Sequence, residues 1–172
     1  QYIPGFQRQF TDARGHTTLT GFQAFDEPTE AAVAWEQGPS GYNLSIERDV
    51  FGKTLHLTRS GSYEGASISV TRSYVYDEYH RLCKTVEPET GATIQYLDAA
   101  DNVAWRGLGL SLTSLSGCDW GDVPANRIVG YAYDTRNRLT STSYGDASPG
   151  IERSYTPDGL LASVSSDGST WT

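Results

Sequence analysis

The chain has 172 residues, with 21 acidic against 13 basic side chains and a formal net charge of −8. This acidic balance argues against nucleic acid and anionic membrane surfaces as partners, because both need clustered Lys and Arg. No apolar run approaches the roughly 18 residues of a membrane-spanning helix. The 11 Tyr, 4 Trp and 18 Gly, together with frequent Thr and Ser, favour strands and tight turns over helices.

A four-residue motif recurs seven times along the chain. Its first residue is usually Asp, and its fourth is Gly, Asn, Asp or His, the residues that most readily adopt a positive φ. The copies are 12–15, 23–26, 49–52, 77–80, 98–101, 134–137 and 156–159. This pattern is typical of a type I turn closed by a bulge, a common hairpin loop. The residues assigned to structural turns are Asp12, Gly15, Asp49, Gly52, Asp77, His80, Asp98, Asp101, Asp134, Asn137 and Gly159.

Strand-like alternation flanks most of these turns. Before Asp77, the apolar residues of 67–77 fall mainly on one parity and the small polar residues on the other, as on the two faces of a sheet. A strand-end aromatic residue often precedes the turn: Phe22, Tyr76, Tyr133 and Tyr155. A charged or amide residue often follows it, such as Arg81, and stacking of the copies would bring that residue near the Asp of a neighbouring turn. The fold class predicted is all-β, with consecutive antiparallel β-hairpins forming a spiral or curved sheet.

One region spans 1–172, since no stretch of the sequence has the composition of a linker. The segments 36–42 and 144–150 have the composition of hairpin tips. A Gly, Ser and Leu-rich insertion at about 107–125 is expected to project from the sheet as a loop. The sequence contains no Met, so Gln1 is not a translation start, and we expect the chain to be a segment processed from a longer precursor.

The two cysteines, Cys83 and Cys118, are 35 positions apart and belong to no CxxC pair, which argues against a zinc site. Two interpretations stay open. The cysteines are either buried free thiols or a disulfide, which would indicate an oxidising compartment. We favour the disulfide.

Signatures of catalysis or ligand binding are missing from the sequence. The three histidines are scattered, and there is no GxSxG elbow or complete dinucleotide fingerprint. We therefore predict no catalytic, cofactor-binding or metal-binding residues and no cofactor. An enzyme site in the insertion, near Trp120 and Asp122, is the remaining catalytic alternative. Trp35, Trp105, Trp120 and Trp171 are expected to pack on the sheet and insertion, and would form a sugar or protein contact if exposed.

Two segments carry a family resemblance. YDEYHRL at 76–82 and YDTRNRL at 133–139 resemble the Tyr-Asp or RHS repeat, Tyr-Asp-x-x-Gly-Arg-Leu. The segment 87–91 (EPETG) is similar to the family's middle turn, and 96–105 (YLDAADNVAW) resembles its partner half. Further copies are 154–164 and, less closely, 10–18 and 48–54. Asp, His or Asn often stands in place of the family's Gly.

This resemblance implies a spiral sheet that closes into a hollow shell, as in bacterial Tc toxin shell components, Rhs polymorphic toxins and teneurins. In the bacterial members, the shell encloses a C-terminal toxin domain that is released by cleavage at a DPxG-type motif. The present sequence has no Asp-Pro-x-Gly, so no cleavage residues carry over. A closed shell needs several times this length, so this chain would be a section of its wall.

The expected function is therefore that of a non-catalytic structural segment of a secreted or cell-surface bacterial RHS-repeat protein. Its partners would be the rest of a larger polypeptide or neighbouring copies, and an enclosed toxin domain. The alternative is an extracellular binding or self-assembling module, because open sheet edges pair with other chains.

Overall fold

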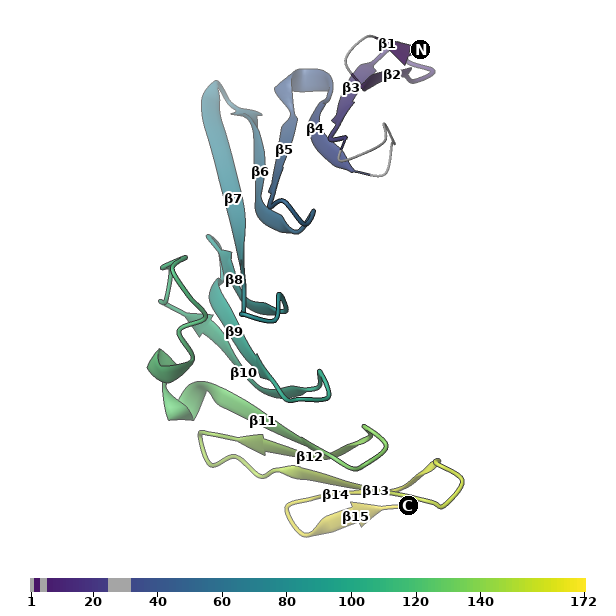
Figure 1. Cartoon of the computed structure of the whole chain (residues 1–172), viewed down its shortest axis with the longest axis vertical. Coiled ribbons are helices and arrows are strands. Elements are labelled where there is room, and N and C mark those ends of the chain that lie inside the picture. The colour runs from purple at the N-terminus through teal and green to yellow at the C-terminus, as the bar shows by residue number, and fades with distance from the viewer. Residues whose placement is uncertain (1, 4–5, 25–31) are drawn as a thin grey trace. The chain divides into compact units, whose positions relative to one another are not determined.

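The computed structural model describes residues 2–3, 6–24 and 32–172, which form an all-β protein (Figure 1). The chain divides into two compact units, Gln1–Tyr74 and Val75–Thr172. The boundary falls inside strand β7 (Ala66–Tyr76) and not in a linker, so composition gives no signal of it.

The first unit consists of strands that pair antiparallel with their neighbours in chain order. They are β1 (Tyr2–Ile3), β2 (Gln7–Thr11), β3 (Thr17–Phe22), β4 (Val33–Gln37), β5 (Asn43–Arg48), β6 (Thr54–Tyr63) and most of β7. The hairpin tip predicted at 36–42 holds a one-turn 3₁₀ helix, η1 (Pro39–Gly41). The longest pairing joins β6 to β7, from His56 opposite Ser73 to Tyr63 opposite Ala66.

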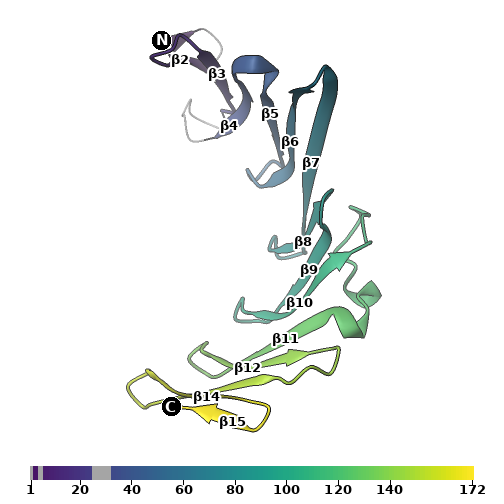
Figure 2. The ribbon, with the colours of Figure 1, turned by 180° about the vertical axis from the view of Figure 1, so that it is seen from behind.

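The second unit continues the same plan after the end of β7. Its strands are β8 (Leu82–Glu87), β9 (Gly91–Leu97), β10 (Val103–Leu110), β11 (Ile128–Tyr133), β12 (Leu139–Tyr144), β13 (Ile151–Tyr155), β14 (Leu161–Ser166) and β15 (Ser169–Trp171). From β8 to β15 each strand is antiparallel to the next, as Figure 2 shows from behind. Two 3₁₀ helices, η2 (Trp120–Asp122) and η3 (Ala125–Arg127), lie between β10 and β11. The prediction of consecutive antiparallel hairpins is confirmed.

The recurrent motif forms one hydrogen-bonding pattern in six of its seven copies. The N–H of the first residue donates to the carbonyl oxygen of the fifth residue, as Asp77 does to Arg81 O (2.8 Å). The carbonyl oxygen of the first residue accepts the N–H of the fourth residue, as Asp77 O does from His80 (2.9 Å). The fourth residues have positive φ, namely Gly15, Gly52, His80, Asp101, Asn137 and Gly159. In the one remaining copy, 23–26, the Gln23 N–H instead donates to Ala32 O (2.8 Å), which indicates a longer connection. Its last two residues lie outside the described residues.

The preference for Asp at the first position has a direct physical cause. One carboxylate oxygen accepts the N–H groups of both the third and the fifth residue, as Asp134 does from Arg136 (2.8 Å) and Arg138 (3.0 Å). In the last copy, 156–159, the Thr156 hydroxyl accepts the N–H of Leu160 (3.0 Å). The side chain therefore satisfies backbone donors that the turn leaves without a ladder partner.

Gly52→Val and Gly159→Val should each destabilise the fold by about 1–3 kcal/mol, because a β-branched side chain resists positive φ. The native φ values are 81° and 92°. The control is Gly61→Val within β6, where φ is ordinary and an added Cβ would meet nothing closer than Gly41 O at 4.0 Å. Denaturant unfolding gives the comparison. Equal stability of the Gly52, Gly159 and Gly61 variants would refute the role assigned to the turns.

The buried core of the second unit lies under the insertion. Ala92 and Ile94 of β9 are fully buried and pack with Leu110 and Val123, and Trp120 is half-buried against them. Strand β10 runs to Leu110, so the insertion begins after that residue and not at 107. It folds back over the sheet instead of projecting from it, because its apolar side chains have a buried apolar sheet face to cover.

Candidate functional site: a turn ladder and a tethered insertion

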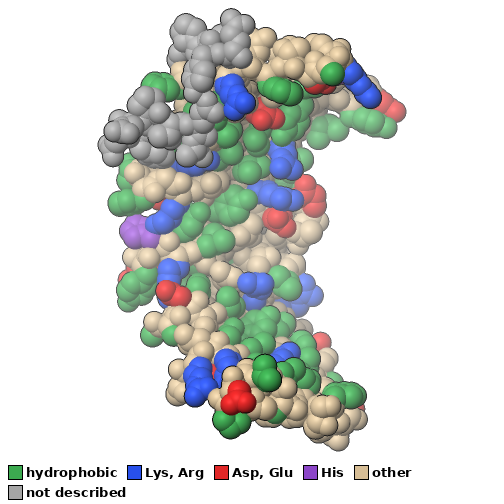
Figure 3. Space-filling model, turned by 90° about the vertical axis from the view of Figure 1, so that its right-hand side faces the viewer, with side chains coloured by type: hydrophobic (Ala, Val, Ile, Leu, Met, Phe, Trp, Pro, Cys, Tyr) green, Lys and Arg blue, Asp and Glu red, His purple; other side chains and the backbone are tan. Residues whose placement is uncertain are grey.

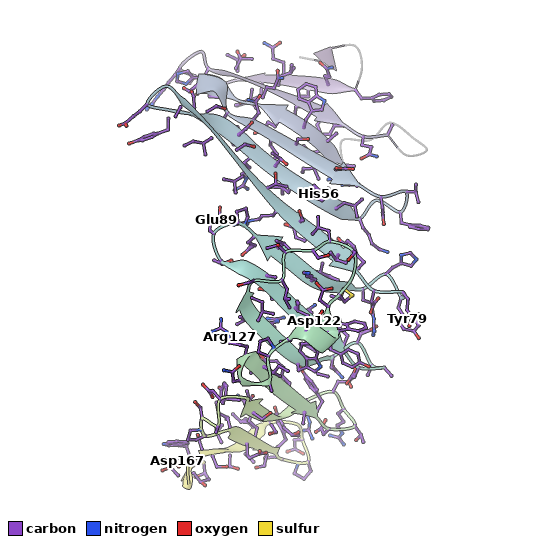
Figure 4. All side chains as sticks on the ribbon, turned by 90° about the vertical axis from the view of Figure 1, so that its left-hand side faces the viewer. His56, Tyr79, Glu89, Asp122, Arg127 and Asp167 are labelled. Carbon is purple, nitrogen blue, oxygen red and sulfur yellow. A yellow bond between two sulfur atoms is a disulfide. The ribbon has the colours of Figure 1, made fainter. Side chains whose placement is uncertain are left out.

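Four turns follow one another along one edge of the second unit (Figure 1). They are 77–81, 98–102, 134–138 and 156–160, and we call them the turn ladder. Each joins an incoming strand to its antiparallel partner, so successive hairpins place their turns on the same side. Figure 4 shows Tyr79 at this edge and Glu89 at the opposite edge.

Arg81 links the first two turns of the ladder. Its Nε donates to Asp77 Oδ2 (2.9 Å), while Nη1 donates to Asp98 O (2.8 Å) and to Asp101 Oδ1 (2.9 Å). Burial opposes ionisation of Asp77, but the hydrogen bonds from the Arg81 backbone and guanidinium outweigh it and lower the pKa of that carboxyl. One guanidinium therefore holds its own turn together and binds the next one.

The later turns are also bonded to one another. Asn102 Nδ2 donates to Asp98 Oδ2 in its own turn (3.2 Å) and to Asn137 Oδ1 in the following turn (3.1 Å). Arg136 Nη1 then reaches Pro157 O (3.2 Å). The residue after each turn was expected near the first-position Asp of a neighbouring turn. Arg81 meets this expectation through its hydrogen bond to Asp98 O, whereas Asn102 bonds to its own Asp and, in the neighbouring turn, to the fourth residue.

The strand-end tyrosines connect each hairpin to the one before it. Tyr133 Oη donates to Val103 O (3.1 Å) and Tyr155 Oη to Leu139 O (2.8 Å). Both acceptors are the first residue of the strand that leaves the preceding turn. The turn beginning at Asp98 has Leu97 in place of Tyr, and there Gln95 Nε2 donates to the equivalent carbonyl, Leu82 O (2.8 Å). The Tyr-Asp pair thus combines a bond to the previous hairpin with closure of the next turn.

Tyr155→Phe should lower the free energy of unfolding by about 1 kcal/mol, the usual net contribution of one such hydrogen bond. The Arg138 guanidinium, 4.3 Å from the Tyr155 ring centroid, can still stack on Phe. The matched control is Tyr79→Phe, since the Tyr79 side chain is exposed. Chemical denaturation measures both, and a Tyr155 variant as stable as the control would contradict this role for the hydroxyl.

The ladder also makes stability depend on pH. The side-chain hydrogen bond from Arg138, followed by its backbone N–H, lowers the pKa of Asp134 from 3.8 to about 2. Below pH 4 the unfolded state therefore binds more protons than the folded state. The stabilisation of the fold by ionised Asp134 is complete above the ordinary pKa of 3.8 and is lost as the pH falls toward 2. Asp134→Asn should therefore flatten the fall in stability between pH 4 and pH 2. Asp158→Asn, at an exposed turn position, is the charge-matched control, and identical pH profiles for the two variants would oppose the assignment.

Two adjacent residues of β8 tether the insertion. Cys83 forms a disulfide with Cys118, which the sequence left open against two free thiols. Next to it, the fully buried Lys84 ammonium donates to Ser114 O (2.6 Å) and to the Asp119 carboxylate. No pattern in the sequence marks Lys84, although it directly follows a cysteine that the sequence did mark.

Further contacts hold the rest of the insertion on the sheet. Trp120 Nε1 donates to Gln95 O (2.9 Å), and Arg127 Nη2 donates to Leu108 O (2.8 Å) and Gly109 O (3.1 Å). Figure 4 shows Asp122 and Arg127 in the segment that crosses the sheet. Asp122 is exposed, whereas Trp120 is half-buried and its indole N–H is bonded to the sheet.

The other candidates from the sequence serve local structure. His16 Nδ1 lies 3.1 Å from Asp12 Oδ2, and His56 Nδ1 lies 2.9 Å from Ser73 Oγ. Phe22 and Tyr76 are half-buried at their strand ends.

The packing expected for the tryptophans applies to Trp35, Trp105 and Trp120, which are half-buried, but not to Trp171, which is 60% exposed. Across residues 2–3, 6–24 and 32–172, no three His, Cys, Asp or Glu side chains are grouped to hold a metal ion.

The fold and the ladder together define an all-β protein of consecutive antiparallel hairpins. In its described part, no helix is long and apolar enough to cross a membrane. The chain matches no family model and no curated protein. Among solved structures it is similar to a chain in the crystal structure of TcdB2-TccC3-Cdc42, with a TM-score of 0.44 and 13% identity. The match covers 94% of this chain and 10% of that one, so the present chain spans about a tenth of that length.

Proposed function

We propose that this chain is a non-catalytic structural segment of a secreted or cell-surface bacterial RHS-repeat protein. It would form part of a shell that encloses or carries a toxin or effector. The turn ladder is the observation that supports this proposal most strongly. The Asp, Tyr, Arg and Asn side chains of the repeated motif serve to close turns and to bond one hairpin to the next.

Contacts of this kind extend a sheet in one direction. Each turn of the ladder is hydrogen-bonded to the next one, as in repeat proteins whose stability is a sum of nearest-neighbour terms. Among the described residues, only five apolar side chains are buried, while large ones such as Phe51, Tyr63 and Leu160 are more than 60% exposed. Figure 3 shows hydrophobic side chains at the surface of the described residues. A wall that is completed by other parts of a larger protein accounts for this exposure.

The disulfide supports an extracellular location for the wall. Disulfides persist in oxidising compartments and are rare in the cytosol. Cys83 and Cys118 join a strand to the insertion that covers it, so the bond secures the one densely packed region of the second unit.

The size and shape of native material from the source test the proposal. Light scattering and negative-stain imaging of the intact parent protein should find a particle several times the mass of this chain, with a hollow interior. A compact monomer of about this chain's mass would contradict the shell. A regular filament would favour the self-assembling module instead.

A further inference from the structure

An open cavity of about 580 Å³ lies between the first two turns of the turn ladder. We call it the ladder groove. Its lining includes Tyr79, Arg81, Tyr96, Asp98 and Asp101. All of these residues belong to the second unit, so the groove is formed within one compact body. Closure of the turns by hydrogen bonds does not involve the two aromatic residues, and the Arg81 guanidinium lies 5.1 Å from the centroid of the Tyr79 ring.

The aromatic walls of the ladder groove are exposed, and one of them is rigidly held. Tyr79 is 70% exposed and Tyr96 is 41% exposed. The Tyr96 ring stacks on Trp105 at 6.1 Å between centroids and meets the Trp120 ring edge-to-face at 5.1 Å. Trp120 is itself anchored by its hydrogen bond to Gln95 O. Two tryptophans thus fix a tyrosine ring whose remaining surface lines the groove.

The polar part of the groove is also held in place before any ligand arrives. The three hydrogen bonds of Arg81 to Asp77, Asp98 and Asp101 fix its guanidinium. The Asp101 side chain is 74% exposed, so its carboxylate can accept further hydrogen bonds from a ligand. Asp98 is engaged by the N–H groups of Ala100 and Asn102. A few fixed polar groups beside apolar walls are what a small-molecule site requires.

The same positions elsewhere in the ladder carry no aromatic side chain. The third turn residue is Tyr79 here, but Ala100, Arg136 and Asp158 in the following turns. The residue two places before the turn is Tyr96 here, but Ala132 and Ser154 before the last two turns. Neither aromatic residue is therefore needed to build a hairpin of this type.

We propose that the ladder groove binds a neutral oligosaccharide. The apolar faces of the sugar rings would pack on Tyr79 and Tyr96, while their hydroxyl groups would donate to Asp101 and accept from the Arg81 guanidinium. Two carboxylates oppose an acidic sugar, and the Arg81 guanidinium occupies the place that a Lys or Arg of a peptide would take. An uncharged ligand with many hydroxyl groups fits both features.

A printed array of neutral, uronic-acid-containing and sialylated oligosaccharides tests the proposal on the whole chain, followed by calorimetry with the neutral tetrasaccharide that binds best. Tyr79→Ala should weaken binding about tenfold, the effect of losing one aromatic contact. The control is Phe51→Ala. Phe51 also occupies a third turn position and is 68% exposed, and a cation lies over its ring, with Lys53 Nζ 5.5 Å from the centroid, as Arg81 lies over Tyr79. It does not line the groove.

Tryptophan fluorescence gives a second readout, because Trp105 and Trp120 lie directly behind Tyr96. The neutral sugar should change the emission of the wild type and of Phe51→Ala at the same concentrations. Circular dichroism establishes that Tyr79→Ala is folded, and Tyr79→Trp, which keeps an aromatic surface, should retain binding. Absence of saccharide binding at millimolar concentrations, equal binding by Tyr79→Ala, or binding to a Lys-rich peptide alone would each overturn the proposal.

Discussion

Asp119→Asn should lower the free energy of unfolding by about 3–5 kcal/mol, because it leaves the buried Lys84 ammonium without its counter-charge. The Lys84 side chain has no exposed surface, and Asp119 is 18% exposed. Asn is the suitable replacement, since residue 119 has a φ of 50° and Asn tolerates this left-handed conformation. Urea unfolding at neutral pH measures the loss.

A double variant separates the ion pair from the local backbone. Lys84→Met together with Asp119→Asn removes both charges and fills most of the buried volume, so it should recover much of the stability lost in Asp119→Asn. If the double variant is no more stable than Asp119→Asn, or if Asp119→Asn itself costs less than about 1 kcal/mol, the buried pair does not tether the insertion.

Replacing both cysteines, Cys83→Ala with Cys118→Ala, should cost about 4 kcal/mol. The bond closes a loop of 35 residues, and the chain-entropy relation assigns about that value to a loop of this length. Ala is preferred to Ser because Cys83 is fully buried and a hydroxyl there would need a partner. Unfolding of the variant and of the oxidised wild type is compared in the absence of reductant.

Reduction of the wild type provides an independent comparison. Reduced wild type and the double alanine variant should unfold at similar denaturant concentrations, both well below the oxidised protein. Coincident unfolding of oxidised and reduced wild type would show that the bond adds nothing to the stability of the insertion. Tryptophan emission includes a signal from the insertion, since the Trp120 indole is bonded to Gln95 O at the sheet.

The turns could be predicted from the sequence because their cause is local. The Asp carboxylate, the following N–H groups and the left-handed fourth residue all lie within five positions, so the pattern is visible in a single stretch such as 134–138. The strand-end tyrosines could be noticed for the same reason. Their acceptors could not, because Tyr133 and Val103 lie 30 positions apart and meet only through the sheet.

The insertion shows where sequence patterns stop being informative. Its Gly and Ser content suggests a projecting loop, but Val123 and Trp120 bring it onto β9, and this depends on which face of the sheet is uncovered. The buried role of Lys84 could not be predicted from the sequence either, since a lysine in a strand usually faces solvent. Only the fold places Asp119 opposite it. The ladder groove likewise depends on Tyr79 and Tyr96 meeting from different hairpins.

Amide hydrogen exchange across the second unit tests most directly whether the turn ladder joins successive hairpins into one structural element. The amides of Asp77, Asp98, Asp134 and Thr156 each donate within their own turns. If the ladder couples the hairpins, these four amides exchange slowly and with opening free energies close to those of the neighbouring strands β9 and β11. Rapid exchange of each turn, independent of the strands and of the other turns, would contradict a wall built from bonded hairpins.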